Sequence, residues 1–152
     1  LMTGGANAKE LAKRLKDGGF YVSDHAKDIM GKLALKTSAE PREVSFVKVK
    51  VKDLGFIQMP TTTQLFDPKH LAQYNLIQCE PEDAIFIRLA DTDQRPRTWY
   101  SIGHSPVPVS RGHPRVFHVE RYGGGERWLR TDCARPEDQW DLECELVFRS
   151  CK

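Results

Sequence analysis

The chain has 152 residues, of which 39% are hydrophobic and 29% charged, and its formal net charge is +2. These values are typical of one globular domain and exclude an intrinsically disordered chain. No run of about 18 apolar residues occurs, so no membrane-spanning helix is predicted. Residues 1–7 have neither a basic start nor an apolar stretch, so no secretory signal is expected there. We therefore expect a cytoplasmic protein whose four cysteines stay reduced.

The charges are distributed unevenly along the chain. Residues 1–52 contain 11 Lys and Arg against 6 Asp and Glu, whereas residues 53–152 contain 12 against 15. The cations are mainly lysines in the first part and mainly arginines in the second. Arginine pairs with carboxylates and stacks on aromatic rings, so we interpret the second group as packed or ligand-binding residues. The net negative charge of residues 53–152 disfavours nucleic acid as a partner.

Two short helices are predicted near the N-terminus. Asn7 is a suitable N-cap for a helix that extends to about Asp17, where two glycines end it. Ser23 is a suitable N-cap for a second helix, which ends near Leu33 or Leu35. Because the connection between them is tight, the pattern predicts a helical hairpin.

The rest of the chain shows the patterns of strands interrupted by one helical segment. Alternating valine and lysine over residues 43–52 indicate a half-buried strand with a lysine-rich solvent face. A helical segment is predicted near 61–75, and Pro68 marks a break or a fresh start within it. The polar residues 80–83 are interpreted as a turn. Further strands are predicted at 84–89, 98–102, 115–121, 126–131 and 145–149.

Together these elements predict a single α+β domain. N-terminal helices pack on a curved, mainly antiparallel sheet of five or six strands, which either stays open or closes in part into a barrel. Residues 1–6 are expected to be flexible and residues 7–40 to form the helical hairpin. Residues 43–152 form the strand-rich core, with the helical segment near 61–75 inserted into it.

From Val47 onward, the order of several motifs resembles one group of proteins. These motifs include Leu54-Gly55-Phe56, Asp93-Gln94, Pro114-Arg115-Val116-Phe117 and Trp128-Leu129-Arg130. The chain resembles small uncharacterised bacterial proteins, some of them encoded on mobile gene cassettes such as those of integrons. The resemblance implies a bacterial cytoplasmic origin and a compact α+β domain. It supplies no activity and no catalytic residue.

No standard motif for catalysis or metal binding is found in the sequence. His113 and His118 flank the start of a predicted strand and could form a zinc site with His104 or Cys133, but their spacing matches no standard signature. Ser101 lacks the GxSxG motif that presents a nucleophilic serine. We predict no metal and no cofactor, and the sequence identifies no catalytic residue.

The sequence predicts non-catalytic binding of a small molecule or of a protein partner. For a small molecule, we expect an anion. We expect the pocket on the concave face of the sheet, with the helices or the irregular segment 103–114 as its rim. Four aromatic residues form its apolar walls and three arginines bind an anionic or carboxylate group. The seven candidate ligand-binding residues are Arg88, Trp99, Tyr100, Arg115, Phe117, Trp128 and Arg130.

Three other functions stay open. A small hydrolase-like enzyme would bring His104, His113 or His118 within hydrogen-bond reach of an Asp, Glu or Cys in a water-excluded cleft. A nucleic-acid-binding module would present the interleaved arginines and aromatic residues on an open face. A homodimer would form if the exposed strand 44–52 paired across a two-fold axis.

Overall fold

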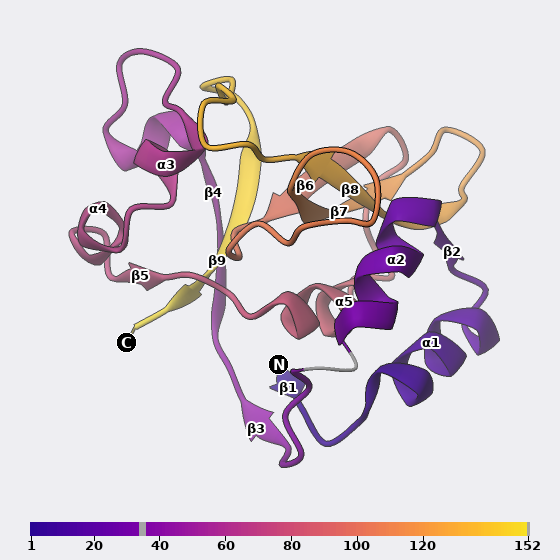
Figure 1. The fold of residues 1–152 in the computed structure, drawn as a ribbon. Helices are drawn as coiled ribbons and strands as arrows, with labels where there is room; N and C mark the ends of the chain where they lie inside the picture. Colours follow the sequence, from indigo (N-terminus) through magenta and orange to yellow (C-terminus); the bar gives the residue numbers. More distant parts are fainter. Residues whose placement is uncertain (34–35, 152) are drawn as a thin grey trace.

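Figure 1 shows the computed structural model, which describes residues 1–33 and 36–151. In that part of the chain, seven strands form one sheet and two short strands form a separate pair. The helices are α1 (Ala8–Asp17), α2 (Asp24–Leu33), α3 (Thr62–Leu65), α4 (Pro68–Ala72) and α5 (Pro81–Ala90), with a 3-10 helix η1 (Val51–Leu54). The strands are β1 (Met2–Thr3), β2 (Tyr21–Val22), β3 (Arg42–Glu43), β4 (Phe46–Lys50), β5 (Leu76–Ile77), β6 (Thr98–Ile102), β7 (Arg115–Arg121), β8 (Arg127–Cys133) and β9 (Glu145–Ser150).

The sheet has the order β2-β8-β7-β6-β9-β4, and β5 pairs with β9 beside this path. The pairs β2–β8 and β6–β9 are parallel, and the other pairs are antiparallel. The α+β class is therefore confirmed. The sheet has seven strands among the described residues instead of five or six, and its outer strands β2 and β4 do not pair there, so it does not close into a barrel.

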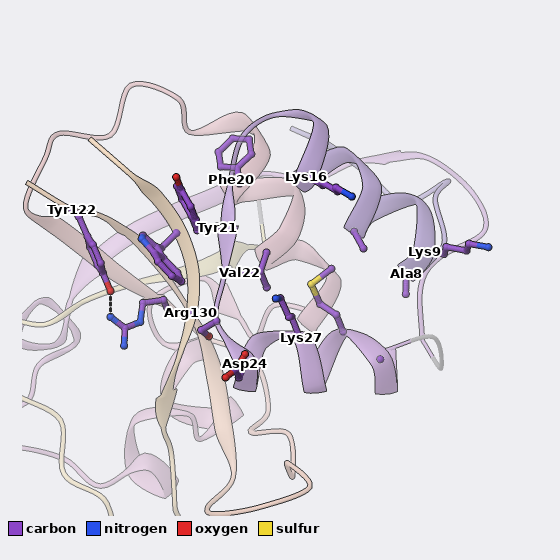
Figure 2. A pocket seen from close by; sticks show the side chains of 15 residues that line it. Ala8, Lys9, Lys16, Phe20, Tyr21, Val22, Asp24, Lys27, Tyr122 and Arg130 are labelled. Atoms are coloured by element: carbon purple, nitrogen blue, oxygen red, sulfur yellow. Dashed lines mark hydrogen bonds between the residues drawn. The ribbon is translucent and has the colours of Figure 1, made fainter. Parts of the chain in front are cut away.

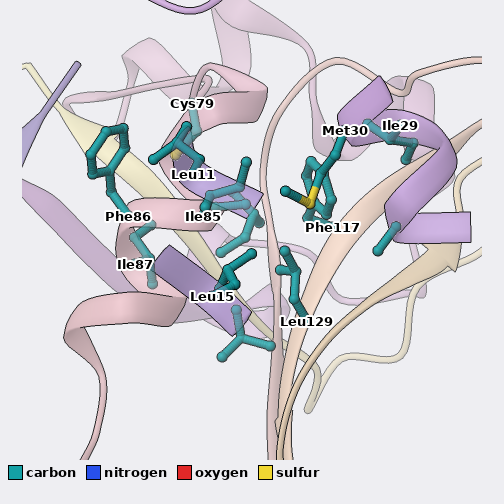
Figure 3. Close-up of a cluster of buried hydrophobic side chains, with 14 of the residues drawn as sticks. Leu11, Leu15, Ile29, Met30, Cys79, Ile85, Phe86, Ile87, Phe117 and Leu129 are labelled. Atoms are coloured by element: carbon teal, nitrogen blue, oxygen red, sulfur yellow. The ribbon is translucent and has the colours of Figure 1, made fainter. Parts of the chain in front are cut away.

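Both faces of the sheet carry a hydrophobic cluster, because residues alternate between the faces along each strand. On the first face, Phe117, Val119 and Leu129 pack against residues of α1, α2 and α5. Figure 3 shows this cluster between the helices and the sheet. On the second face, Val116 and Phe148 pack against residues of η1, α3 and α4. The alternation in 115–121 is thus buried on both sides, which explains why the sequence alone did not decide which face is covered.

The two N-terminal helices form as predicted, with a strand between them. The Asn7 side chain accepts a hydrogen bond from the Glu10 amide (2.9 Å), and the Ser23 hydroxyl accepts one from the Ala26 amide (3.3 Å). Gly19 adopts a positive φ of 77°, which ends α1 and turns the chain into β2. Leu35, one predicted end of the second helix, lies outside the described residues.

Residues 1–6, which we expect to be flexible, take part in main-chain pairing. Strand β1 pairs antiparallel with β3, and the Leu1 ammonium donates to the Val44 carbonyl (3.0 Å). Thr3 and Ala6 are buried, and Ala6 belongs to the cluster on the first face. The start of the chain is therefore held by main-chain pairing and burial, which a terminal sequence does not reveal.

The prediction of a strand at residues 84–89 is wrong, because this segment lies in helix α5. Pro81 occupies the first turn, where its missing amide hydrogen costs nothing. The Asp83 carboxylate accepts a hydrogen bond from the Glu80 amide (2.8 Å) and caps the helix. Residues 80–83 are thus a helix start and not a turn. The helix is buried between the sheet and α1, so it is apolar on several sides and shows no amphipathic period.

The helical segment predicted near 61–75 is confirmed as α3 and α4, and Pro68 begins the second of them. Strand β4 is shorter than the predicted 43–52, because the chain enters η1 at Val51. Within the described ranges, no helix has the length and hydrophobicity needed to cross a membrane.

Candidate functional site

A groove of about 1210 Å³ lies at the β2 edge of the sheet. Its walls come from α1, α2, strand β2 and the β7–β8 hairpin (Figure 2). Alanine, methionine, phenylalanine and valine side chains form its apolar part, which includes Ala8, Ala12, Phe20, Val22 and Met30. We call this space the edge groove.

The local sequence explains how α1 contributes a wall. Leu11 and Leu15 are fully buried on the face of α1 that packs into the core. Lys9, Ala12 and Lys16 are spaced by three and four residues, so they share a neighbouring face, which borders the groove. The chain then turns at Gly19 and enters β2, whose two residues point to opposite sides of the sheet edge.

Three aromatic rings form a ladder along one wall of the edge groove. The rings of Tyr21 and Trp128 stack with their centroids 5.2 Å apart and an interplanar angle of 23°. The rings of Trp128 and Tyr122 stack at 5.4 Å and 27°. Tyr21 and Trp128 are brought together by the parallel pairing of β2 with β8. Arg130 Nη1 donates a hydrogen bond to the Tyr122 hydroxyl and fixes the inner end of the ladder.

The lining of the edge groove is predominantly cationic. It contains Lys9, Lys16, Lys27 and Arg130, whereas Asp24 supplies a carboxylate. Within the described part of the chain, none of the three lysines makes a salt bridge or a side-chain hydrogen bond. Three ammonium groups are therefore free to bind an anion.

A polar cluster lies on the second face of the sheet, next to Arg130. His118 Nδ1 is 2.9 Å from Asp132 Oδ2, and His118 Nε2 is 3.1 Å from Glu120 Oε1. The Ser101 hydroxyl donates to Asp132 Oδ2 (2.8 Å). Glu120 Oε1 is also 3.9 Å from Arg130 Nη1, which links this cluster to the groove.

The contacts of Asp132 favour its charged form. Burial alone would raise the pKa of Asp132, but hydrogen bonds from His118 and Ser101 and the nearby Arg130 charge hold it below its ordinary value. The geometry differs from a Ser–His–Asp triad, in which serine and carboxylate contact opposite ring nitrogens. Here Ser101 and Asp132 both lie on the Nδ1 side, and Ser101 is only 4% exposed. Ser101 is therefore not placed to act as a nucleophile.

The other residues considered for chemistry have structural contacts. His104 is fully buried and hydrogen-bonds to backbone groups of Ser105 and Phe117. All four cysteines are free, and burial raises the pKa of the Cys79 thiol, which disfavours the reactive thiolate. Among the residues that the structure describes, no three His, Cys, Asp or Glu side chains are arranged to hold a metal ion.

The seven predicted ligand-binding residues do not form one surface. Trp128 and Arg130 line the edge groove. Trp99 is 54% exposed on β6 and is not part of the groove lining. Tyr100 and Phe117 belong to the core of the first face, and the Tyr100 hydroxyl donates to Asp91 Oδ2 (2.7 Å). Residues of helices pack on both faces of the sheet, and the groove lies at the sheet edge and not on a face of the sheet.

Two of the three predicted arginines are engaged inside the protein. Arg88 is fully buried and donates hydrogen bonds to Gln94 and to backbone carbonyls. Arg115 Nη1 donates to the Thr131 hydroxyl (3.2 Å) on the neighbouring strand. Arg130, which is 42% exposed, is the predicted arginine that can reach a ligand in the groove.

Tyr21, Lys9, Lys16 and Lys27 line the groove but were not predicted as site residues from the sequence. The signal that was available is the apolar run Phe20-Tyr21-Val22 between Gly19 and the N-cap Ser23. This run is compatible with a short strand, but its pairing with β8 is a tertiary contact that the local sequence does not specify. Comparison with protein families, with curated proteins and with solved structures finds no match to this chain.

Proposed function

We propose that the protein binds a small anionic ligand, without converting it, in the edge groove. The observation that carries this proposal is the lining, which contains four cationic side chains, several apolar side chains and, among the described residues, a single carboxylate, Asp24. Charged groups that lack intramolecular partners attract an anion more strongly than paired ones, because no internal bond must be broken. The apolar floor adds affinity through burial of ligand surface.

Charge reversal of Lys16 and Lys27 tests this proposal. We expect the double variant Lys16→Glu/Lys27→Glu to bind phenyl phosphate roughly tenfold or more weakly than the unchanged protein, because two attractions become repulsions. Isothermal titration calorimetry at low and high salt measures the effect. The difference should shrink at high salt, because both lysines are exposed to solvent.

A matched control separates a specific site from a general charge effect. The double variant Lys13→Glu/Lys69→Glu changes the net charge by the same amount, and neither residue lines the edge groove. We expect this control to keep the affinity within about twofold. Equal losses in both double variants would contradict the proposal, because the binding would then follow net charge and not the groove.

A second candidate function, a small hydrolase-like enzyme, is favoured by the His118 cluster. His118 contacts a carboxylate at each ring nitrogen, which is the environment of a general acid or base. Release of nitrophenol from p-nitrophenyl phosphate or acetate would support this function if His118→Gln abolished it. Turnover that stays unchanged in His118→Gln would remove the cluster from consideration.

The contacts of the arginines give less support to a nucleic-acid-binding module. Arg121 donates to the Gln94 carbonyl (2.8 Å), and Arg127 donates to the Thr92 carbonyl (3.0 Å). Arg149 forms a salt bridge with the buried Asp83 (2.7 Å). These guanidinium groups stabilise loops and the core, so they do not form the open basic face that a nucleic-acid strand needs.

A further inference from the structure

We propose that the ligand of the edge groove carries a flat aromatic ring that stacks on Tyr21, while its acidic group binds the groove lysines. This inference rests on the proposed function and names the chemical class of the ligand. It follows from three observations: the state of Tyr21, the geometry of the aromatic ladder, and the size of the groove.

Tyr21 differs from the other tyrosine of the ladder and from the buried Tyr100. The Tyr100 hydroxyl is bonded to Asp91, and the Tyr122 hydroxyl accepts from Arg130. The Tyr21 side chain is 51% exposed, and its hydroxyl has no hydrogen-bond partner in the described part of the chain. Tyr21 is therefore an amphipathic ring that is held at the groove wall and is only half covered.

The ladder holds Tyr21 in a defined orientation. Its ring stacks on Trp128, which stacks on Tyr122, and the main chain of β2 is paired with β8. The ring is thus ordered by the protein before any ligand arrives, so a ligand that stacks on it does not have to supply that ordering energy. Every flat aromatic group can stack on such a surface, whereas an aliphatic group of the same size gains only the burial of its area.

The groove is also larger than a simple inorganic anion requires. Its volume of about 1210 Å³ is that of a site for a small organic molecule. Figure 2 shows the rings of Tyr21 and Tyr122 on one side of β2 and Lys27 on the other. A ligand that reaches from Tyr21 around the edge strand β2 to Lys27 therefore carries an aromatic part at one end and an acidic part at the other. Aromatic carboxylates and nucleoside phosphates share this chemistry.

A single-stranded nucleic acid combines the same groups, but the lining favours a small molecule. A protein that binds an extended strand offers a basic path with a succession of stacking rings. Here the cations of the groove are confined to the ends of two short helices and to Arg130, and residues 53–152 carry a net negative charge. The test below therefore includes the binding of an oligonucleotide as one of its outcomes.

The test compares two probes that differ in one property. Phenyl phosphate and cyclohexyl phosphate have the same charge and similar size, but only the first has an aromatic ring. We expect phenyl phosphate to bind roughly tenfold more tightly, as judged from the strength of stacking on aromatic side chains. Affinities are measured by calorimetry and by fluorescence of Trp128. Trp99→Phe removes the emission of the exposed Trp99, and the buried Trp140, which also lies outside the groove lining, contributes a constant background.

Two variants of Tyr21 show whether the preference arises at this ring. In Tyr21→Phe we expect the preference to persist, because the ring remains. In Tyr21→Leu we expect it to fall to about twofold or less, while cyclohexyl phosphate binds as before. Thermal unfolding confirms that both variants fold, and Tyr21 is exposed enough to tolerate them.

The outcomes separate this inference from the proposed function. Equal affinity for both phosphates, with both weakened by Lys16→Glu/Lys27→Glu, would leave anion binding in place and overturn the aromatic class. If neither phosphate binds at millimolar concentration, both the aromatic class and the proposed anion binding are overturned. Adenosine monophosphate, benzoate and oligo(dT) then distinguish the sources of the ring. Tighter binding of oligo(dT) than of both small anions, lost in Tyr21→Leu, would overturn the small-molecule assignment in favour of a nucleic-acid strand.

Discussion

Replacement of Arg88 by methionine is expected to lower the free energy of unfolding by about 3–5 kcal/mol. Arg88 Nη1 donates to the Gln94 side chain (2.8 Å) and to the carbonyls of Glu120 (3.1 Å) and Trp128 (3.2 Å). Its Nη2 donates to the Asp91 carbonyl (2.7 Å). One buried guanidinium thus connects the end of α5 to strands β7 and β8.

The size of this effect comes from the acceptors that would be left behind. Methionine fills part of the volume but donates no hydrogen bond, so three part-buried backbone carbonyls and the buried Gln94 amide oxygen lose the bond to Arg88. Lysine is a poor substitute, because a single ammonium cannot reproduce the fork of a guanidinium. We expect Arg88→Lys to recover only a part of the lost stability.

Urea denaturation of Arg88→Met measures this prediction, and Arg95→Met is its control. Arg95 is exposed in the loop between α5 and β6, so we expect a change within about 0.5 kcal/mol. A similar small change in both variants would show that the buried bonds of Arg88 contribute little. The result also bears on function. Arg88 was a predicted ligand-binding residue, but its burial indicates that it stabilises the fold.

Arg88 was predicted as a pocket residue because residues 84–89 were interpreted as a strand and not as a helix. A short apolar run looks the same in a buried strand and in a buried helix, and only the flanking residues separate the two. Pro81 and Asp83 are the residues that indicate a helix start. By contrast, β7 was predicted with its observed bounds, because residues 115–121 alternate over their whole length between turn-forming segments.

The candidate site was predictable only in part, for a related reason. Trp128 and Arg130 were found because a stacking ring and a guanidinium are typical ligand-binding groups wherever they are exposed. Lys16 and Lys27 appear in the sequence as solvated charges on helix surfaces. They become part of a site only because β2 attaches both helices to the edge of the sheet. Such long-range placement is not encoded in local periodicity.

The free energy of unfolding is expected to decrease as the pH falls from 6.5 to 4, because of His104. This side chain is fully buried, and burial lowers its pKa from the ordinary 6.5 to about 4. Its Nδ1 donates to the Ser105 carbonyl (2.8 Å), and its Nε2 accepts from the Phe117 amide (2.9 Å). A second proton would leave this amide of β7 without an acceptor and would place a charge in the core.

The sign follows from the two pKa values of His104. Between pH 6.5 and 4 the unfolded chain binds a proton at His104 that the folded protein does not, so acid favours unfolding. The loss is about 2 kcal/mol at pH 5 and approaches about 3 kcal/mol near pH 4, below which His104 adds little further.

Glutamine can accept from the Phe117 amide without titrating, so His104→Gln should have a flatter profile between pH 7 and 5. His113→Gln, which removes an exposed histidine, should keep the profile of the unchanged protein. If His104→Gln loses as much stability over this range as His113→Gln, the acid sensitivity arises elsewhere, and the buried imidazole is not its cause.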